Sequence, residues 1–173
     1  MNKNFCDCCG CGSLLPKREI KGDTISTCLS CGFMFVSKKT SDSDYSDSYR
    51  DVPSPSKFLK GRHYDLLKFI KEHKTPSVLE VGSGFGGLGF LCRLEGIKYT
   101  GIEPDLIRRK FMQTLSLEGI LKSHTELNEA FDLILLDNVL EHVESPKSLL
   151  LDLSHHLSKN GKILIIVPNR YDF

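Results

Sequence analysis

The sequence predicts an α/β protein in which a parallel β-sheet is covered by helices, preceded by a small cysteine-rich module. Two observations support this fold class. Short apolar segments alternate with helical patterns between residues 57 and 173, and six of the seven cysteines fall within the first 31 residues. The composition, with 40% hydrophobic and 26% charged residues among 173, excludes a disordered chain. We therefore expect a cysteine module at 1–36, a Ser- and Asp-rich linker at 37–56 and a main domain at 57–173.

The elements of the main domain follow from apolar spacing and from helix start and stop signals. Helical patterns cover 57–73, the segment from the glycine cluster to about residue 95, and 105–117. Pro146 directly after Ser145 predicts the start of a further helix, which we expect to end near Gly161. Short apolar segments predict five strands at 78–81, 97–102, 119–122, 131–136 and 162–167. Apolar strands that alternate with helices are typical of a parallel sheet buried on both faces.

The cysteine spacing predicts a zinc site. Two Cys-x₂-Cys pairs separated by sixteen residues fit a four-cysteine site, and four thiolate ligands leave no open position for catalysis. The predicted ligands of a structural zinc are Cys8, Cys11, Cys28 and Cys31. Cys6-x₂-Cys9 has the same form and stays an alternative to the first pair. The first pair is preferred because Cys11 is followed by Gly12 and Ser13.

Charge and hydropathy exclude several classes of partner. Lys and Arg number 23 and Asp and Glu number 22, so the net charge of +1 offers no broad surface for a nucleic acid. The longest apolar run, Ile163–Val167, is far shorter than the ~20 residues of a membrane span. The N-terminus shows no secretory signal, so a cytoplasmic protein is expected, without nucleic-acid or membrane partners.

A glycine-rich turn follows the first predicted strand. Residues 80–87 read Glu-Val-Gly-Ser-Gly-Phe-Gly-Gly, and Glu103 ends the next strand, 21 residues after Gly82. A carboxylate at that distance can accept hydrogen bonds from the ribose hydroxyls of an adenosine. The glycines fit both a dinucleotide fingerprint and a methyltransferase pattern. Glu80 favours the second, because an anion beside the turn opposes a pyrophosphate and suits the cationic sulfonium and ammonium of S-adenosylmethionine.

At this point the sequence resembles the class I S-adenosylmethionine-dependent methyltransferases over roughly 57–169. The segments VLEVGSGFG, YTGIEPD, FDLILLDNVLEHVESPKSLL and GKILIIVPN occur in the order of that family. The resemblance implies a Rossmann-like sheet with strand order 3-2-1-4-5. The cysteine module, the linker with Tyr45 and Tyr49, and this domain together resemble the sugar C-methyltransferase branch, whose acceptors are nucleotide-linked sugars.

The resemblance also implies roles for particular residues. Positions at the glycine turn and at the ends of the second and fourth strands would bind S-adenosylmethionine, and His142 of the Leu-Glu-His signature is the candidate catalytic base. The implied cofactor-binding residues are Glu80, Gly82, Ser83, Gly84, Gly86, Glu103, Pro104, Asp137 and Asn138. The implied function is methyl transfer to a small-molecule acceptor. An RNA-modifying methyltransferase and a non-catalytic cofactor-binding or interaction module remain alternatives.

The sequence departs from the family in two places. The family's sheet has seven strands, and its last two have no counterpart before Phe173. The fifth strand would then be an edge, which predicts self-association through that strand. The segment after the third strand lacks the Asp often found beside the adenine amino group, and Glu126 is the candidate substitute. Arg62 and His63 on the first helix are interpreted as surface residues.

Overall fold

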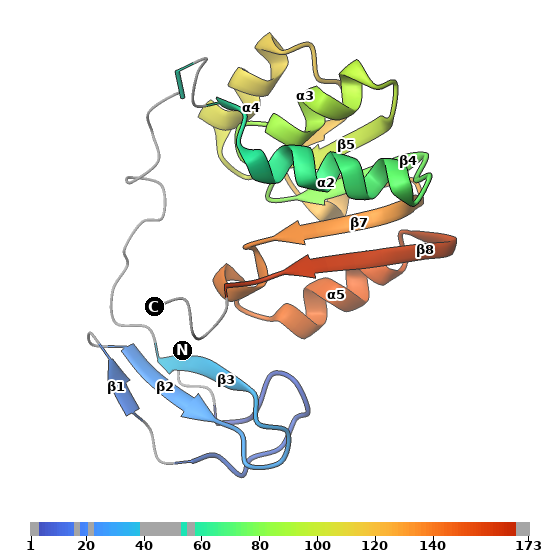
Figure 1. Cartoon of the computed structure of the whole chain (residues 1–173). Helices are drawn as coiled ribbons and strands as arrows, with labels where there is room; N and C mark the ends of the chain where they lie inside the picture. The colour runs from blue at the N-terminus through green and yellow to red at the C-terminus, as the bar shows by residue number, and fades with distance from the viewer. Residues whose placement is uncertain (1–3, 16–17, 21–22, 39–52, 55–57, 169–173) are drawn as a thin grey trace.

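The computed structural model describes residues 4–15, 18–20, 23–38, 53–54 and 58–168. Most of the expected linker, including Tyr45 and Tyr49, lies outside this described part. The cysteine module carries an antiparallel sheet of β1 (Arg18–Ile20), β2 (Asp23–Thr27) and β3 (Met34–Lys38), in that order (Figure 1). An isolated bridge joins Leu14, before β1, to Cys28, which directly follows β2.

The main domain is a five-stranded parallel sheet in the order β6-β5-β4-β7-β8, which confirms the predicted fold class and strand order. Its strands are β4 (Ser77–Val81), β5 (Lys98–Ile102), β6 (Ile120–Leu121), β7 (Phe131–Asp137) and β8 (Leu157–Ile166). The helices are α2 (Gly61–Glu72), α3 (Gly87–Leu94), α4 (Leu106–Thr114) and α5 (Pro146–Ser154), with short 3₁₀ turns η1 (His124–Glu126) and η2 (Leu140–His142).

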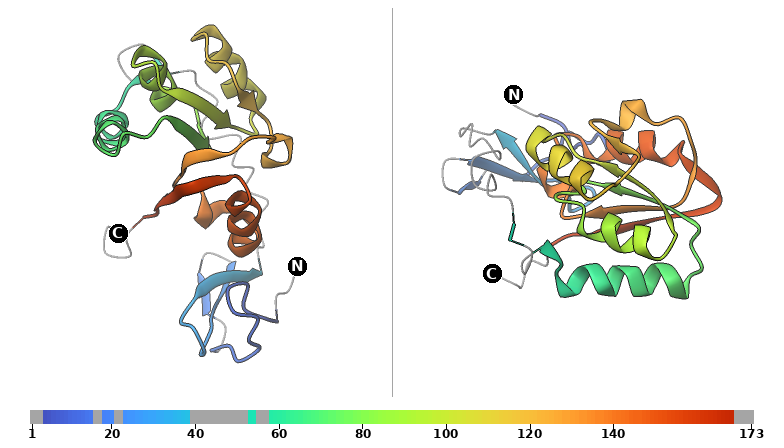
Figure 2. Two further views of the ribbon diagram at one scale, coloured as in Figure 1. Left: turned by 90° about the vertical axis from the view of Figure 1, so that its right-hand side faces the viewer. Right: turned by 90° about the horizontal axis from the view of Figure 1, so that it is seen from above.

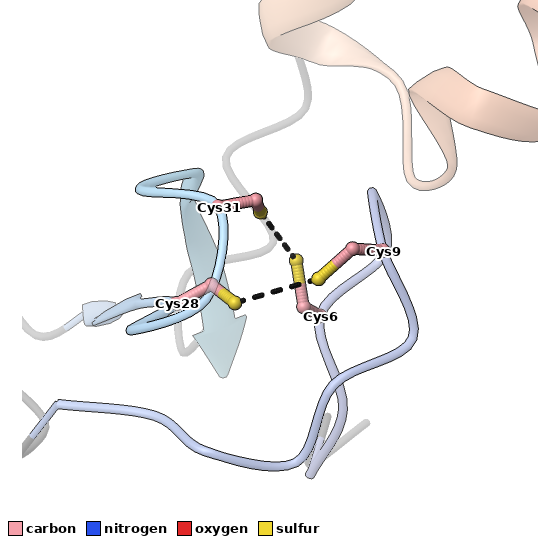
Figure 3. A group of neighbouring side chains, drawn as sticks. All are labelled: Cys6, Cys9, Cys28 and Cys31. Carbon is pink, nitrogen blue, oxygen red and sulfur yellow. Dashed lines mark hydrogen bonds between the residues drawn. The ribbon is translucent and has the colours of Figure 1, made fainter.

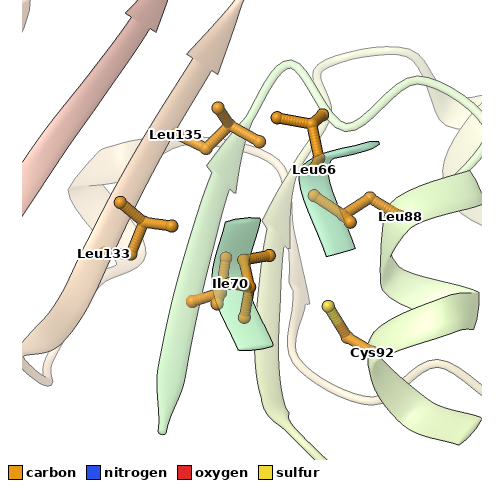
Figure 4. Packing of buried hydrophobic residues seen from close by; sticks show 7 residues of the cluster. Leu66, Ile70, Leu88, Cys92, Leu133 and Leu135 are labelled. Carbon is orange, nitrogen blue, oxygen red and sulfur yellow. The ribbon is translucent and has the colours of Figure 1, made fainter. Parts of the chain in front are cut away.

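Helices cover both faces of this sheet (Figure 2). On one face, side chains of α2 and α3 pack on β4 and β7; this cluster contains Leu66, Ile70, Val78, Leu88, Cys92, Leu133 and Leu135 (Figure 4). On the other face α5 packs on the sheet; that cluster contains Leu79, Val81, Ile102, Phe131, Ile134, Leu136 and Leu153. Neighbouring residues of β4 therefore point to opposite faces, as the pleat of a strand requires.

Cys92, the cysteine outside the N-terminal group, lies inside α3 and is a buried packing residue. No helix in the described part of the chain combines the length and the apolar character that a bilayer crossing demands.

The last helix and strand differ from the sequence prediction. The helix ends at Ser154 and β8 begins at Leu157, so Gly161 lies inside the strand and does not end the helix. A Cβ at Gly161 would lie 2.7 Å from the backbone oxygen of Phe131. The register between β7 and β8 shifts at this point. The glycine thus permits a close approach of two strands at an irregularity in their pairing.

Candidate cofactor site and cysteine centre

The glycine turn connects β4 to α3 in a conformation that requires glycine. Gly82, Gly84 and Gly86 have φ values of 74°, 57° and 75°, in the left-handed region that other residues rarely adopt. A Cβ at Gly82 would lie 2.7 Å from Val139 Cγ2, and one at Gly86 would lie 2.6 Å from Met112 Cγ. A Cβ at Gly84 would have no neighbouring atom within 4 Å. Gly84 is therefore the position of the turn at which a ligand can approach the backbone.

Glu103, the residue that the spacing predicts to bind a ribose, lies beside this turn. Glu103 directly follows β5, and only 4% of its surface is exposed. Its Oε2 accepts a hydrogen bond of 2.8 Å from the backbone N–H of Gly84, and its Oε1 accepts one of 3.0 Å from that of Asp105. Arg108 Nη1 lies 3.7 Å from Oε2. The carboxylate is thus held in one orientation by two backbone N–H groups and a guanidinium.

Ser83 stabilises the turn through hydrogen bonds to the end of β5. Its backbone N–H and that of Gly82 both donate to the carbonyl oxygen of Ile102, at 3.0 and 2.8 Å. The Ser83 hydroxyl is buried and lies 3.4 Å from the same oxygen and 3.6 Å from Met112 Sδ. The side chain of Ser83 therefore supports the turn from inside the fold and does not line the cavity described below.

A cavity of about 390 Å³ opens next to this turn, at the carboxyl end of the sheet on the face that α5 covers. Open α/β sheets place their ligands at this edge. The cavity is lined by the ends of β4 and β5, by η1 and by α5; its walls are Val81, Gly82, Ile102, Pro104, Lys122, Ser123, His124, Val139, Val143, Ser145, Ser148, Leu149 and Asp152. Of the residues that the sequence assigned to the cofactor, Gly82 and Pro104 line this cavity.

Glu80 lies on the other face of the sheet. It is buried, and the hydroxyl of Tyr99 donates a 2.5 Å hydrogen bond to its Oε2. Burial raises the pKa of Glu80 to about 8; the hydrogen bond from Tyr99 opposes this rise, and the charges of Asp137 and Glu103 add to it. Glu80 is therefore largely protonated at neutral pH in this arrangement. The sequence argument, which took Glu80 for an anion exposed to the cofactor, does not describe this side chain.

Asp137 and Asn138 end β7 beside the turn. Asp137 Oδ1 lies 2.5 Å from Arg62 Nη2, and burial raises the pKa of Asp137 while Arg62 lowers it. Asn138 adopts a left-handed conformation with φ of 53°, and its N–H donates to the carbonyl oxygen of Ile166 at 2.9 Å. A non-glycine residue in this conformation turns the chain sharply directly after β7.

The first helix contributes residues that the sequence analysis assigned to the surface. Arg62 binds Asp137, and the half-buried imidazole of His63 packs directly on Gly87, where a Cβ would lie 2.2 Å from His63 Cε1. Burial lowers the pKa of His63, and the positive charges of Lys60 and Arg62 lower it further. A glycine at the start of α3 was the one sequence signal for this close packing of two helices.

Two further predictions concern single residues. His142 lies in η2 and is exposed, so the structure places it at the carboxyl edge without burying it; its catalytic role stays a prediction. Glu126 does not line the cavity. Its Oε1 accepts hydrogen bonds from the backbone N–H groups of Lys122 and Ser123, at 3.0 and 2.8 Å. The expectation that Glu126 faces an adenine is therefore wrong, because this carboxylate caps η1.

Four cysteines converge in the N-terminal module, but the first pair differs from the predicted one. The sulfur atoms of Cys6, Cys9, Cys28 and Cys31 all lie within 4.8 Å of one another (Figure 3). The Sγ atoms of Cys6 and Cys31, and those of Cys9 and Cys28, are 3.6 Å apart. A tetrahedral zinc with bonds of about 2.3 Å to sulfur needs sulfurs roughly 3.8 Å apart, so these four thiols fit such an ion.

The preference for Cys8 and Cys11 was wrong because the two Cys-x₂-Cys-Gly turns share one backbone pattern. In the first, Gly10 N–H donates to Cys6 O at 2.8 Å; in the second, Gly32 N–H donates to Cys28 O at 2.9 Å. Both glycines are left-handed, with φ of 75° and 73°. Cys11 accepts a bond from Cys6 N–H through its carbonyl, as Phe33 does from Cys28. Cys11 therefore takes the position of Phe33, after the turn, and its side chain is not part of the cluster.

Comparison with known proteins agrees with this architecture. The chain is 30% identical over 105 residues to an uncharacterized protein of Methanocaldococcus jannaschii, covering 61% of this chain and 46% of that protein. It is 30% identical over 131 residues to the histidine protein methyltransferase 1 homolog of Dictyostelium discoideum, covering 62% and 41%. The chain thus spans less than half the length of these two relatives.

Solved structures share the fold at low identity. The plantazolicin methyltransferase BpumL in complex with SAH superposes with a TM-score of 0.53 at 20% identity, over 62% of this chain and 46% of that one. Coclaurine N-methyltransferase bound to N-methylheliamine and SAH gives a TM-score of 0.51 at 22% identity, over 66% and 38%. The family model described as "Methyltransferase domain" matches residues 32–173, most of the chain. The chain therefore belongs to this methyltransferase-domain family.

Proposed function

We propose that this domain binds S-adenosylmethionine at the carboxyl edge of its sheet and transfers the methyl group to a small-molecule acceptor. The observation that carries the proposal is the juxtaposition of Gly84, whose backbone is open to a ligand, with the carboxylate of Glu103. Their near neighbours in the chain, Gly82, Ile102 and Pro104, line the cavity of about 390 Å³. Membership in the methyltransferase-domain family supports the same reaction class.

The residues present fit an adenosine-containing cofactor. Each oxygen of Glu103 accepts one backbone hydrogen bond and keeps a second lone pair, which suits the two hydroxyls of a ribose. The apolar side chains of Ile102, Val139 and Leu149 line the cavity and suit the faces of a purine. Gly84 removes the Cβ that would obstruct the ligand where it crosses the turn.

The protein's contribution to methyl transfer is positioning. S-adenosylmethionine supplies a methyl group activated by its sulfonium, and the transfer requires the acceptor atom to approach that methyl in line. The ion pair between Arg62 and Asp137 and the left-handed turn at Asn138 lie at the carboxyl end of β7, where we expect the acceptor to enter. His142 on η2 would serve as the base for an acceptor that must lose a proton.

The acceptor class is a narrower proposal. The combination of a cysteine module with this domain resembles the sugar C-methyltransferase branch and favours a nucleotide-linked sugar. A peptide or protein side chain is the second candidate, because the Dictyostelium relative is named a histidine protein methyltransferase homolog. Transfer of labelled methyl from S-adenosylmethionine to a panel of nucleotide sugars and histidine-containing peptides would separate the two.

We also propose that Cys6, Cys9, Cys28 and Cys31 hold a structural zinc. The support is the fit of the sulfur separations to a tetrahedral ion, and the two matching glycine turns that deliver the thiols. An all-thiolate site has no open position, so the ion would stabilise the module and take no part in methyl transfer.

Calorimetry tests the cofactor. We expect S-adenosylmethionine and its demethylated product SAH to bind in one-to-one ratio and NAD to show no binding to the same sample. Binding of NAD without S-adenosylmethionine would overturn the proposal, because the glycines alone also fit a dinucleotide. Binding of none of these ligands would leave the site without a cofactor and favour a non-catalytic module.

A further inference from the structure

A second cavity, of about 200 Å³, opens at the edge of the sheet opposite the glycine turn. It lies between the end of α2, the start of β7 and the first half of β8. Pro76 on its wall directly precedes β4, and Asp132 is the second residue of β7, so this is the edge at which the parallel strands begin. Methyl transfer at the carboxyl edge gives this cavity no role.

The wall of this cavity carries hydrogen-bond donors that the fold does not use. Four of its polar side chains have no hydrogen-bond or ion-pair partner within the part of the chain that the structure describes: those of Lys74, Thr75, Asn160 and Lys162. They are two ammonium groups, a hydroxyl and an amide, and the ammonium groups can only donate. Two positive charges among several donors suit the oxygen atoms of a small anion.

Asp132 is the one carboxylate among the residues of this wall, and hydroxyl groups occupy both of its oxygens. Oδ2 accepts a 2.6 Å hydrogen bond from the hydroxyl of Ser77, and Oδ1 accepts one of 2.7 Å from that of Ser158. These hydrogen bonds, that from Ser77 foremost, lower the pKa of Asp132. The single negative charge is thus directed at two fixed donors and offsets only one of the two lysines, which leaves the wall with a net positive charge.

An irregularity in the pairing of β7 and β8 shapes one side of the cavity. Phe131 pairs with Leu157 and Leu133 pairs with Lys162, so β8 advances five positions while β7 advances two. Such irregularities redirect side chains at the rim of a sheet. The additional residues of β8 include Asn160, which lies on the cavity wall two positions before Lys162.

Lys74 lies on the other side of the cavity, in a conformation that favours glycine. Its φ is 49°, in the left-handed region that commonly follows the end of a helix. The backbone N–H groups of His73, Lys74 and Thr75 cap the last carbonyl groups of α2, each at 3.1 Å. The helix end is therefore closed by its own backbone, and the ammonium group of Lys74 is available to a ligand.

We propose that this cavity is a binding site for a phosphate group. The ammonium groups of Lys74 and Lys162 would supply the positive charge, and Thr75 and Asn160 would donate further hydrogen bonds to the phosphate oxygens. The cavity is smaller than the ~300–1,000 Å³ of sites for drug-sized ligands. Its ligand is therefore the free phosphate ion or the phosphate of a small ester.

Heteronuclear NMR of the whole chain tests this site with two probes, inorganic phosphate and glycerol 3-phosphate, at an ionic strength held constant with sodium chloride. We expect the backbone amide signals of the four donor residues to shift and to saturate. Tighter binding of inorganic phosphate would identify the free ion as the ligand, and tighter binding of glycerol 3-phosphate would identify an ester. The absence of saturable shifts with both probes would overturn the proposal.

Two variants remove one lysine each. Lys162→Ala should weaken phosphate binding about tenfold, because a hydrogen bond to a charged group is lost. Lys74→Gly should weaken it to a similar extent and leave the chain at least as stable to urea, because glycine suits the left-handed conformation at this position. A loss of affinity in Lys74→Gly thus cannot come from a loss of folding.

The matched control is Lys110→Ala, which removes the same charge from an exposed position on α4 outside the cavity wall and should bind phosphate as the wild type does. Circular dichroism shows whether each variant is folded. Unchanged affinity in folded Lys74→Gly and Lys162→Ala, or an equal loss in Lys110→Ala, would show that phosphate responds only to the overall charge and would exclude this cavity as its site. No measurement here uses S-adenosylmethionine, so the result leaves the proposed function as it stands.

Discussion

Two carboxylates one strand apart have opposite environments in this site. Glu103 accepts backbone hydrogen bonds from Gly84 and Asp105 and faces Arg108, and these three contacts hold the carboxylate in one orientation. Glu80 is buried against a single phenol, that of Tyr99, and its pKa is raised to about 8. Glu103 is therefore oriented to accept hydrogen bonds from hydroxyl groups. Glu80 is a buried acid on the opposite face, whose ionisation is coupled to the stability of the fold.

Replacing Glu103 should weaken cofactor binding. Hydrogen bonds to a charged group contribute ~1.5–3 kcal/mol each, so losing two in Glu103→Ala should weaken binding of S-adenosylmethionine about a hundredfold or more. Glu103→Gln keeps one acceptor and the shape, and should cost about tenfold. Calorimetry measures both. Glu72→Ala, an exposed acid at the end of α2, is the control and should bind as the wild type does. Equal affinity of Glu103→Ala and wild type would exclude Glu103 from the site.

Glu80 should make the stability of the domain depend on pH. The ordinary pKa of this group is 4.5 and its folded value is about 8, so between these values the folded state binds a proton that the unfolded chain has released. Stability should therefore fall as pH rises through this window, by at most about 1.4 kcal/mol per pH unit. Glu80→Gln removes this dependence and should gain stability relative to wild type as pH rises from 5 to 8.

Urea denaturation at several pH values measures the difference between the two proteins. Parallel curves of unfolding free energy against pH for wild type and Glu80→Gln would show that Glu80 keeps an ordinary pKa in the folded state. Glu72→Gln provides the matched exposed site and should leave the slope unchanged.

At the level of elements, the cysteine module should depend on its metal. Structural zinc sites contribute apparent binding free energies of ~10–16 kcal/mol, a large share of the folding energy of so small a unit. Cys6→Ser or Cys28→Ser should unfold the module and leave the main domain intact. Cys8→Ser and Cys11→Ser, which change neighbouring thiols outside the cluster, should not.

Metal analysis and heteronuclear NMR give the measurement. We expect one equivalent of zinc in the wild type and in Cys8→Ser and Cys11→Ser, and less than half an equivalent in Cys6→Ser and Cys28→Ser. Loss of zinc from Cys8→Ser or Cys11→Ser, with full zinc in Cys6→Ser, would restore the ligand set that the spacing first indicated.

The elements that the sequence predicted well have strong local signals. β4 and β7 are apolar runs, and the glycine turn between β4 and α3 has a distinctive composition. The prediction was wrong where two local patterns fitted the sequence equally well. The patterns Cys6-x₂-Cys9-Gly and Cys8-x₂-Cys11-Gly cannot be distinguished by sequence alone. The backbone shows that Gly10, and not Gly12, adopts the left-handed conformation of the turn. In the sequence Gly161 likewise resembles a glycine that ends a helix. Only the close approach of the Phe131 backbone shows that it lies at an irregularity in the pairing of β7 and β8.

Contacts between residues that are distant in the sequence were the second source of error in the prediction. The range 105–117 was predicted as a helix, but its sequence does not show which face is buried: the apolar residues Leu106 and Ile107 are exposed, and Met112 is the buried residue of α4. Asp105 caps this helix, accepting a hydrogen bond from Arg108 N–H at 2.9 Å. The ion pair of Arg62 with Asp137 joins residues whose proximity depends on the whole sheet. No periodicity within one element records such contacts.

On the scale of the whole molecule, β8 is an edge of the five-stranded sheet among the described residues. Ile165 and Val167 at this edge are 41% and 51% exposed. An apolar edge strand with unpaired backbone groups pairs readily with another chain, so we expect self-association that grows with concentration. Ile165→Lys should reduce it, because a charged side chain at an edge opposes pairing.

Sedimentation velocity over a range of concentrations measures this association. Leu151→Lys is the matched control, since it adds the same charge at an exposed leucine of α5, and it should associate as the wild type does. A monomer at every concentration in the wild type would show that this edge does not mediate pairing.

The central position of β4 has a consequence for how the chain folds. β4 pairs with β5, which follows it closely, and with β7; the hydrogen bond of Ser77 to Asp132 spans 55 positions in the chain. Loop closure over the longer span costs more entropy, and contacts between distant residues form slowly. During synthesis β4 and β5 leave the ribosome well before β7. In a nascent chain that ends before β7, the middle strand of the final sheet has an open edge, and its apolar side chains Val78 and Leu79 lack the packing partners that β7 supplies.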